Sequence, residues 1–210
     1  MSRRKSFLGV CSLVLLLTFG SNAGAVNLAL SFTGGSVFVA FDGTPQTIGW
    51  WFTVNSTPVV VSALGFWDQT PANPLSSAHQ VGLWTDAGAL LASTTVGVND
   101  PLTGSFRFNS IASVTLAAGT YRLGGTISSA DGDTYVQFAS SVSTDPLITH
   151  MGDTRNDSNA GFSFPNIATT NSGRFGPNML VTAVPEPTTL VLLGLGLAGA
   201  GAIHRRKRKV

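Results

Sequence analysis

Charged side chains are scarce in this chain of 210 residues: only 10% of them are Asp, Glu, Lys or Arg, whereas 43% are hydrophobic. Between Val26 and Ala183 there is no lysine, and four arginines against nine aspartates give a formal charge of −5. The other eight basic residues lie at the two ends. A nucleic-acid-binding protein needs a basic patch on its folded surface. The composition therefore excludes nucleic acid as a partner and argues against intrinsic disorder.

Cysteine, glutamate and histidine are also rare. Cys11 lies in an apolar N-terminal run, so a processed protein would contain no disulfide. The sole glutamate is Glu186 near the C-terminus, and no Gly-x-Ser-x-Gly motif of serine hydrolases occurs. A Ser-His-Asp grouping assembled from distant residues is the remaining enzymatic alternative. We expect no enzyme and no cofactor, and a structural or surface position for His79.

Metal ligands are equally few in the middle of the chain. Two histidines without cysteine fall short of the usual zinc ligands. Oxygen ligands for calcium cluster at Asp131-Gly132-Asp133 and between Asp153 and Asp157. Asp and Asn in turns also bond to their own backbone, and neither segment has a recognised calcium-loop pattern. We therefore expect two turns, with no bound metal.

The first 25 residues have the features of a signal peptide. A basic start is followed by 13 apolar residues from Phe7 to Phe19, and Ala23 and Ala25 offer the small residues that signal peptidase accepts. A helix of 13 residues is about 20 Å long, short of the ~30 Å bilayer core, which disfavours a permanent anchor. We expect cleavage after Ala25.

The C-terminal segment 184–210 has three parts in a fixed order. Pro185 and Pro187 flank Glu186 and favour extended backbone at Val184 and Glu186. A run of 14 apolar residues, 190–203, contains four glycines and predicts a short, marginal transmembrane helix. A basic cluster that should stay in the cytoplasm completes the chain: Arg205, Arg206, Lys207, Arg208 and Lys209.

This order of Val184-Pro185-Glu186-Pro187, apolar helix and basic end resembles the PEP-CTERM sorting signals of Gram-negative bacteria. The resemblance implies an exosortase-like processing enzyme as partner. It also implies transient anchoring in the inner membrane with the domain outside, followed by delivery to the cell surface or extracellular matrix. A plain tail anchor is the alternative. We accordingly divide the chain into a signal peptide (1–25), a folded domain (26–183) and a sorting tail (184–210).

Short apolar segments rich in β-branched and aromatic residues alternate with turn residues throughout the middle, without sustained helical periodicity. Ten strands are predicted: 28–32, 36–41, 48–54, 59–67, 80–85, 90–96, 104–112, 119–128, 134–140 and 179–182. This number of strands in about 160 residues favours an all-β, two-sheet β-sandwich of jelly-roll or immunoglobulin-like type.

Four motifs between residues 50 and 125 resemble a domain of unknown function found in secreted bacterial proteins. They are Ala63-Leu64-Gly65-Phe66-Trp67, His79-Gln80-Val81-Gly82-Leu83-Trp84, Gly88-Ala89-Leu90-Leu91-Ala92 and Leu116-Ala117-Ala118-Gly119-Thr120-Tyr121. That family has the appearance of a β-sandwich and no agreed activity. The resemblance therefore supports the expected fold and implies little about function.

Strand alternation assigns the two faces of segment 48–54. Ile48, Trp50, Phe52 and Val54 share the predicted core face, which directs Trp51 outward. The same alternation directs Trp84 outward from segment 80–85. An exposed indole could form a flat platform for a sugar ring, so Trp51 and Trp84 are candidate ligand residues. The alternative is that a loop or a second layer covers both rings.

Two functions follow from these features. The first is a non-catalytic module that binds extracellular polysaccharide, because exosortase systems resemble partners of exopolysaccharide production. The second is a structural or protein-interaction coat protein without a small ligand. A planar row of exposed aromatics would favour the first, whereas a flat, apolar, unpaired edge strand would favour the second.

Overall fold

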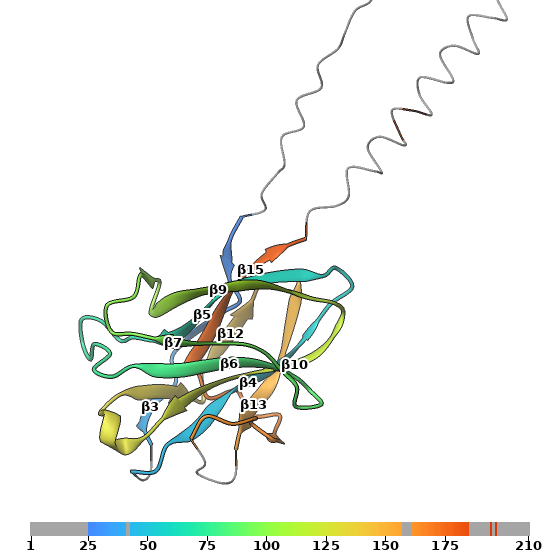
Figure 1. Ribbon diagram of the computed structural model, residues 1–210. Helices are drawn as coiled ribbons and strands as arrows, with labels where there is room; N and C mark the ends of the chain where they lie inside the picture. The colour runs from blue at the N-terminus through green and yellow to red at the C-terminus, as the bar shows by residue number, and fades with distance from the viewer. Residues whose placement is uncertain (1–24, 41–42, 157–160, 185–193, 195, 197–210) are drawn as a thin grey trace, which may run out of the picture.

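The computed structural model describes residues 25–40, 43–156 and 161–184, together with residues 194 and 196. Within 25–184 the regular structure consists of β-strands and one 3-10 turn, η1 (Ser129–Asp131) (Figure 1). The predicted all-β class is therefore confirmed. The expected signal helix and the expected C-terminal helix lie almost entirely outside the described residues. Within the described part of the chain, no helix has the length and apolar character needed to cross a membrane.

Two antiparallel sheets contain most of the strands. The five-stranded sheet has the order β1-β15-β5-β9-β8, formed by Asn27–Leu28, Pro177–Ala183, Val59–Trp67, Phe106–Leu116 and Leu102–Thr103. The six-stranded sheet has the order β14-β13-β4-β10-β6-β7, formed by Ile167–Ala168, Ile148–Arg155, Gln46–Val54, Gly119–Ile127, His79–Thr85 and Leu90–Val96. The sequence predicted two sheets, whereas the described residues form these two and two further two-stranded sheets.

Two further segments form a bent antiparallel ribbon. Its first half pairs β2 (Leu30–Thr33) with β12 (Ser141–Thr144), and its second half pairs β3 (Ser36–Val39) with β11 (Thr134–Gln137). Between the halves, residues 34–35 lie opposite residues 138–140, so the pairing is interrupted by unequal numbers of residues.

Alternation along β4 places the large apolar side chains on one face, as predicted. Ile48, Trp50 and Phe52 are fully buried, and Val54 is nearly so. The Trp50 Nε1 donates a hydrogen bond to the carbonyl oxygen of Pro177 in the other sheet, at 2.9 Å. Burying an aromatic side chain of this kind contributes about 1.5–3 kcal/mol.

Close contact between the sheets also depends on a glycine in β10. A Cβ atom at Gly125 would lie 2.8 Å from the ring of Phe66, which belongs to β5 of the five-stranded sheet. Because real Cβ contacts are longer than this, the missing side chain makes room for the phenylalanine. Residues of both sheets therefore share one hydrophobic core.

Both described ends of the domain lie together. β1 and β15 are antiparallel neighbours, with Asn27 opposite Val181. Ala25 and Ala183 line the same shallow depression. In Figure 1 β15 and the blue N-terminal strand lie together at one end of the domain, and β3 is labelled toward the opposite end. The domain therefore presents β3 away from its points of attachment.

Candidate functional site

Trp84 points away from the core face of β6, as alternation predicted, but its ring is covered. Only 3% of the residue is exposed, and the centroid of its ring lies 5.2 Å from that of Phe162. The ring also lies over Gly82, whose absent Cβ would be 2.4 Å from it. A substituent at this glycine would displace the indole, so the glycine and the phenylalanine enclose the ring from two sides.

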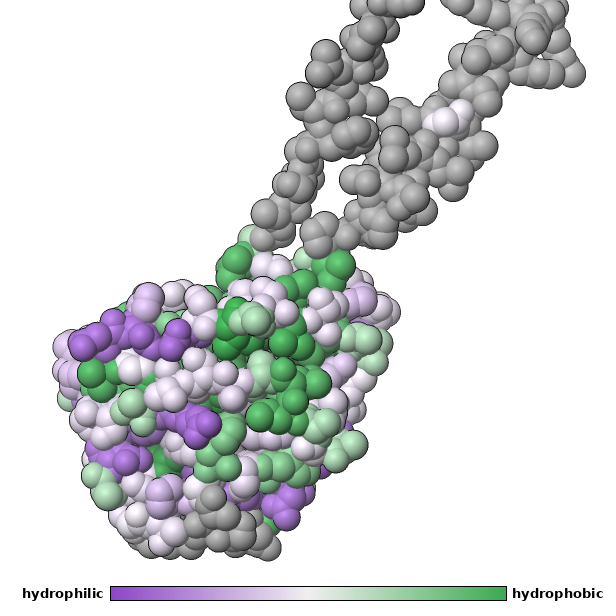
Figure 2. Space-filling model, viewed as in Figure 1, coloured by the Kyte–Doolittle hydropathy of each residue, from purple (hydrophilic) through white to green (hydrophobic). Residues whose placement is uncertain are grey.

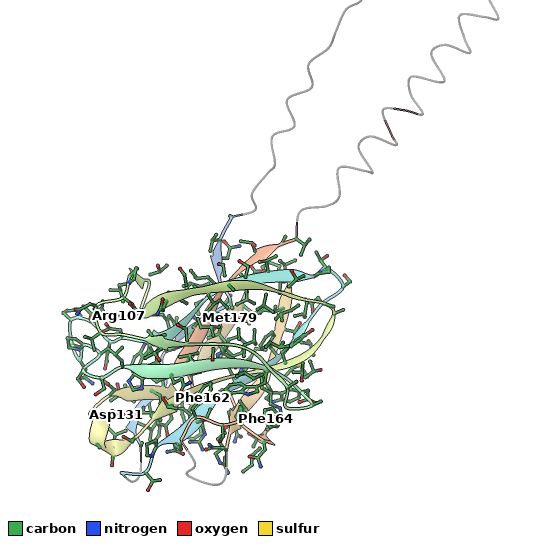
Figure 3. The ribbon with its side chains drawn as sticks, in the orientation of Figure 1. Arg107, Asp131, Phe162, Phe164 and Met179 are labelled. Carbon is green, nitrogen blue, oxygen red and sulfur yellow. The ribbon has the colours of Figure 1, made fainter. Side chains whose placement is uncertain are left out.

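The cover is a strap formed by residues 161–172, and Arg122 of β10 holds its middle. Arg122 donates a hydrogen bond from Nη1 to the Pro165 carbonyl oxygen at 2.8 Å, and its guanidinium lies 4.9 Å from the ring centroid of Phe164. Its Nη2 lies 2.7 Å from a carboxylate oxygen of Asp86. Figure 3 labels Phe162 and Phe164 on this segment, at one side of the sheets.

Trp51 is bonded to the same strap. Its Nε1 donates a hydrogen bond to the carbonyl oxygen of Thr169 at 2.8 Å, and the residue is half-buried. An exposed platform at Trp84 is therefore wrong, because a loop covers its ring as the alternative predicted. Trp51 is only partly covered, and its indole N–H is bonded to that loop.

Asp133 takes part in a buried hydrogen-bond network rather than in a group of free carboxylates. Its Oδ2 lies 3.0 Å from Nε2 of His79 and accepts a hydrogen bond from the Ser77 amide at 2.9 Å. Its Oδ1 accepts from the Ser76 amide at 2.7 Å. Burial acts to raise the pKa of Asp133, but the hydrogen bonds from His79 and from the two amides outweigh it and hold the pKa below its ordinary value.

The network brings a serine, a histidine and an aspartate together, but not in the order of a catalytic triad. The Ser76 hydroxyl lies 3.1 Å from Asp133, and the carboxylate separates it from the imidazole. The other ring nitrogen of His79, Nδ1, lies 2.6 Å from the Thr126 carbonyl oxygen. Both nitrogens are thus engaged, and the ring stacks on Phe66 with 4.0 Å between centroids. His79 has the structural position that the sequence predicted.

The remaining candidate calcium ligands form hydrogen bonds or ion pairs within the domain, or lie outside the described residues. Asp131 accepts a hydrogen bond from the Ser128 amide at 2.7 Å and caps η1. Asp153 is paired with Arg174 at 3.2 Å and accepts a short hydrogen bond from the Thr169 hydroxyl. Asp157 lies outside the described residues. Among residues 25–40, 43–156 and 161–184, no three His, Cys, Asp or Glu side chains are grouped as metal ligands.

His150 in β13 is a functional candidate that sequence reasoning passed over. Its Nε2 is buried without a hydrogen-bond partner, and its ring is close to those of Trp50 and Phe175, with centroids 6.1 Å and 5.7 Å away. Burial lowers the pKa of His150, although the negative charge of Asp153 opposes this shift. In the neutral ring this Nε2 can remain an unprotonated lone pair. In the protonated ring it would be a buried N–H without an acceptor, which costs free energy.

This arrangement predicts a loss of stability in mild acid. Because the folded state resists protonating His150, the unfolded state binds the extra proton as the pH falls below about 6.5, and the free energy of unfolding decreases. We expect the Tm to fall between pH 7 and pH 5, before most carboxylates titrate. The variant His150→Phe should flatten that pH dependence. An unchanged slope in the variant would contradict the assignment.

The structure exposes an apolar edge that sequence reasoning also missed. Val37 and Val39 of β3 are 48% and 54% exposed, and Phe138, which follows β11, is 62% exposed. We call these three residues the β3 edge patch. β3 pairs with β11 and with no other strand in the described part of the chain. The absence of any charged residue from Val26 to Ala40 was the available signal.

The visible face of the domain is apolar near its attachment points. Figure 2 shows apolar side chains gathered at the end where β1 and β15 lie and toward the middle of this face, with polar residues more frequent at the sides and at the opposite end. The tail itself begins directly after β15, at Val184, whose amide still bonds to the Pro58 carbonyl oxygen at 3.2 Å. The sorting residues Pro185, Glu186 and Pro187 and the basic cluster 205–209 lie outside the described residues, as does Ala23.

A comparison with known protein families matches residues 183–209 to the PEP-CTERM protein-sorting motif. No curated protein and no solved structure matches the chain. The folded domain ahead of the tail is therefore unidentified, and its resemblance to a secreted domain of unknown function gains no support. The C-terminus carries a PEP-CTERM sorting motif, which implies export, processing by an exosortase and sorting to the cell envelope.

Proposed function

We propose that this protein is a non-catalytic structural or interaction protein of the cell envelope, and that its β-sandwich domain acts through protein–protein contact. The β3 edge patch carries the proposal. It combines exposed apolar side chains with a strand that has a free edge in the described structure. Such edges present unpaired backbone groups and are templates for pairing with another chain.

The edge lacks the charged and proline residues by which soluble proteins often block such pairing. Its sequence, Ser36-Val37-Phe38-Val39, contains neither charge nor proline, and the paired residues Thr134 and Gln137 are neutral. Lysine or proline on an edge would oppose association. The strand is only four residues long, so the contact that it offers is small.

Delivery to the envelope supports this function. The sorting motif leads to a location outside the cytoplasm, and β3 lies toward the end of the domain opposite β1 and β15 (Figure 1). An edge presented in this way is accessible to neighbouring proteins at the same surface.

Polysaccharide binding, our first hypothesis from the sequence, has lost the residues that supported it. Its candidate platform was Trp51 with Trp84. Phe162 of the strap covers the Trp84 ring, and the Trp51 ring is half-buried with its N–H bonded to Thr169. A glycan array with the processed protein tests this hypothesis directly. Specific binding of one polysaccharide, reduced by a substitution in the strap, would restore it.

The variant Val39→Lys tests the proposed function. Val39 is more than half exposed, so the fold should tolerate the change, while a charge on the edge should oppose contact with a neighbour. We expect severalfold less processed protein in the washed envelope fraction and correspondingly more in the medium. Leu90→Lys is the matched control, because Leu90 is 49% exposed on β7, a different edge strand. Equal retention of both variants and the parent protein would reject the proposal.

A further inference from the structure

The partner of the β3 edge patch follows from its sequence. We propose that the partner is a second copy of this chain, which pairs its own β3 antiparallel to the first around Phe38. This inference rests on the proposed function, because it names the neighbour with which the envelope protein makes contact.

The edge is self-complementary. The segment Val37-Phe38-Val39 reads identically in both directions. Antiparallel pairing of two copies places Val37 opposite the second copy's Val39 and places the two Phe38 residues opposite each other. A two-fold symmetric contact requires such a surface, because both copies use the same residues. The pairing would join two ribbons into one sheet of the order β11-β3-β3-β11.

Exposed apolar area continues beyond the strand itself. Phe138 adopts a φ of 56°, in the left-handed region that bulky residues rarely occupy. Its ring is nevertheless mostly exposed, and it contacts Phe38 with 6.0 Å between centroids. The ring therefore extends the exposed apolar surface of the β3–β11 ribbon beyond the edge strand, through its contact with Phe38.

The distribution of charge favours this edge for contact between two copies. The domain has a formal charge of −5, so two copies repel each other at most approaches. Of the aspartates that precede β11, Asp133 is buried against His79, and Asp131 accepts a hydrogen bond from the Ser128 amide. An uncharged edge lets two copies meet without placing like charges opposite each other.

A four-residue contact is small, and we expect weak association in dilute solution. Sorting to one envelope surface raises the local concentration of copies that all present the same edge. Tethering of this kind converts weak contacts into stable ones without adding new interactions. Self-association should therefore be strongest at the cell surface.

Disulfide trapping in exporting cells tests the register. Two full-length chains with different epitope tags carry Cys11→Ser, one with Val37→Cys and the other with Val39→Cys. Exported compartments permit disulfides. Directly opposite residues have Cβ atoms about 4.5–5.5 Å apart, whereas diagonal residues are about 7–8 Å apart, too far for a disulfide. We expect a mixed dimer at least about tenfold more abundant than the dimer from either variant expressed alone.

The variant Leu90→Cys controls for random collision, because Leu90 has a similar exposure on β7. A dimer equally abundant with Leu90→Cys, or with Val37→Cys alone, would overturn the proposed pairing. An adduct with a chain of another mass would show a different partner. If Val39→Lys releases the protein from the envelope but no mixed dimer forms, the second copy is rejected and the proposed function stands.

Discussion

Replacing Trp84 with alanine is expected to lower the free energy of unfolding by about 3–5 kcal/mol, the range for removing a buried tryptophan. The indole is 3% exposed, rests on Gly82 and contacts Phe162 of the strap. Truncation would leave a cavity that these rigid neighbours could fill only in part. For a domain of this size, the Tm should fall by about 10 °C or more.

Trp51→Ala is the matched control for this measurement. Trp51 projects from the same outer face of the six-stranded sheet and lies under the same strap, but it is half-buried and held by one hydrogen bond to Thr169. Its replacement should cost less than that of Trp84. Urea denaturation of both variants gives the comparison. A loss below about 1 kcal/mol for Trp84→Ala, typical of a surface residue, would show that the strap leaves the ring open.

Local patterns were sufficient where a strand is regular. Segments 59–67 and 90–96 were predicted with the bounds that β5 and β7 have in the structure. The inward side chains of segment 48–54 were also assigned correctly, because strand alternation depends only on neighbouring residues. Local sequence was therefore enough to predict the fold class and the core face of β4.

The strands that the prediction missed have weak local patterns. β13 contains Gly152, and its pairing with β4 shifts register between His150 and Gly152. That bulge breaks the alternation on which strand prediction relies. β12 has the sequence Ser141-Val142-Ser143-Thr144, which is short and largely polar. It is a strand because β2, more than 100 residues away in the chain, supplies its hydrogen-bond partners.

Long-range contacts also decided the candidate sites. Alternation correctly directed Trp84 away from the core face, but the ring that covers it belongs to Phe162, far along the chain. Val37 shows the same limit: it lies in the predicted strand 36–41, but that pattern did not indicate that the fold leaves the residue 48% exposed. Whether a second layer covers an outward residue depends on topology, which local pattern does not contain.

The sorting tail should determine whether the protein remains attached to the membrane. Deleting residues 190–210 removes the apolar run and the basic cluster, the parts that hold a chain in the bilayer and retain its end in the cytoplasm. We expect the exported domain to appear almost entirely as a soluble product, in the periplasm or medium. Its fold should be intact, because the described core lies within residues 29–181.

Replacing Pro185, Glu186 and Pro187 with alanines separates recognition from anchoring. This variant keeps the apolar run and the basic cluster, so it should remain in the membrane at full length, because the motif that implies exosortase processing is lost. Immunoblots of membrane, periplasmic and medium fractions distinguish the three forms by size and location. Normal processing of the alanine variant, or unchanged surface delivery of either variant, would contradict the sorting role of the tail. Loss of processing in the alanine variant, together with release of the deletion variant, would assign cleavage to the motif and retention to the apolar run.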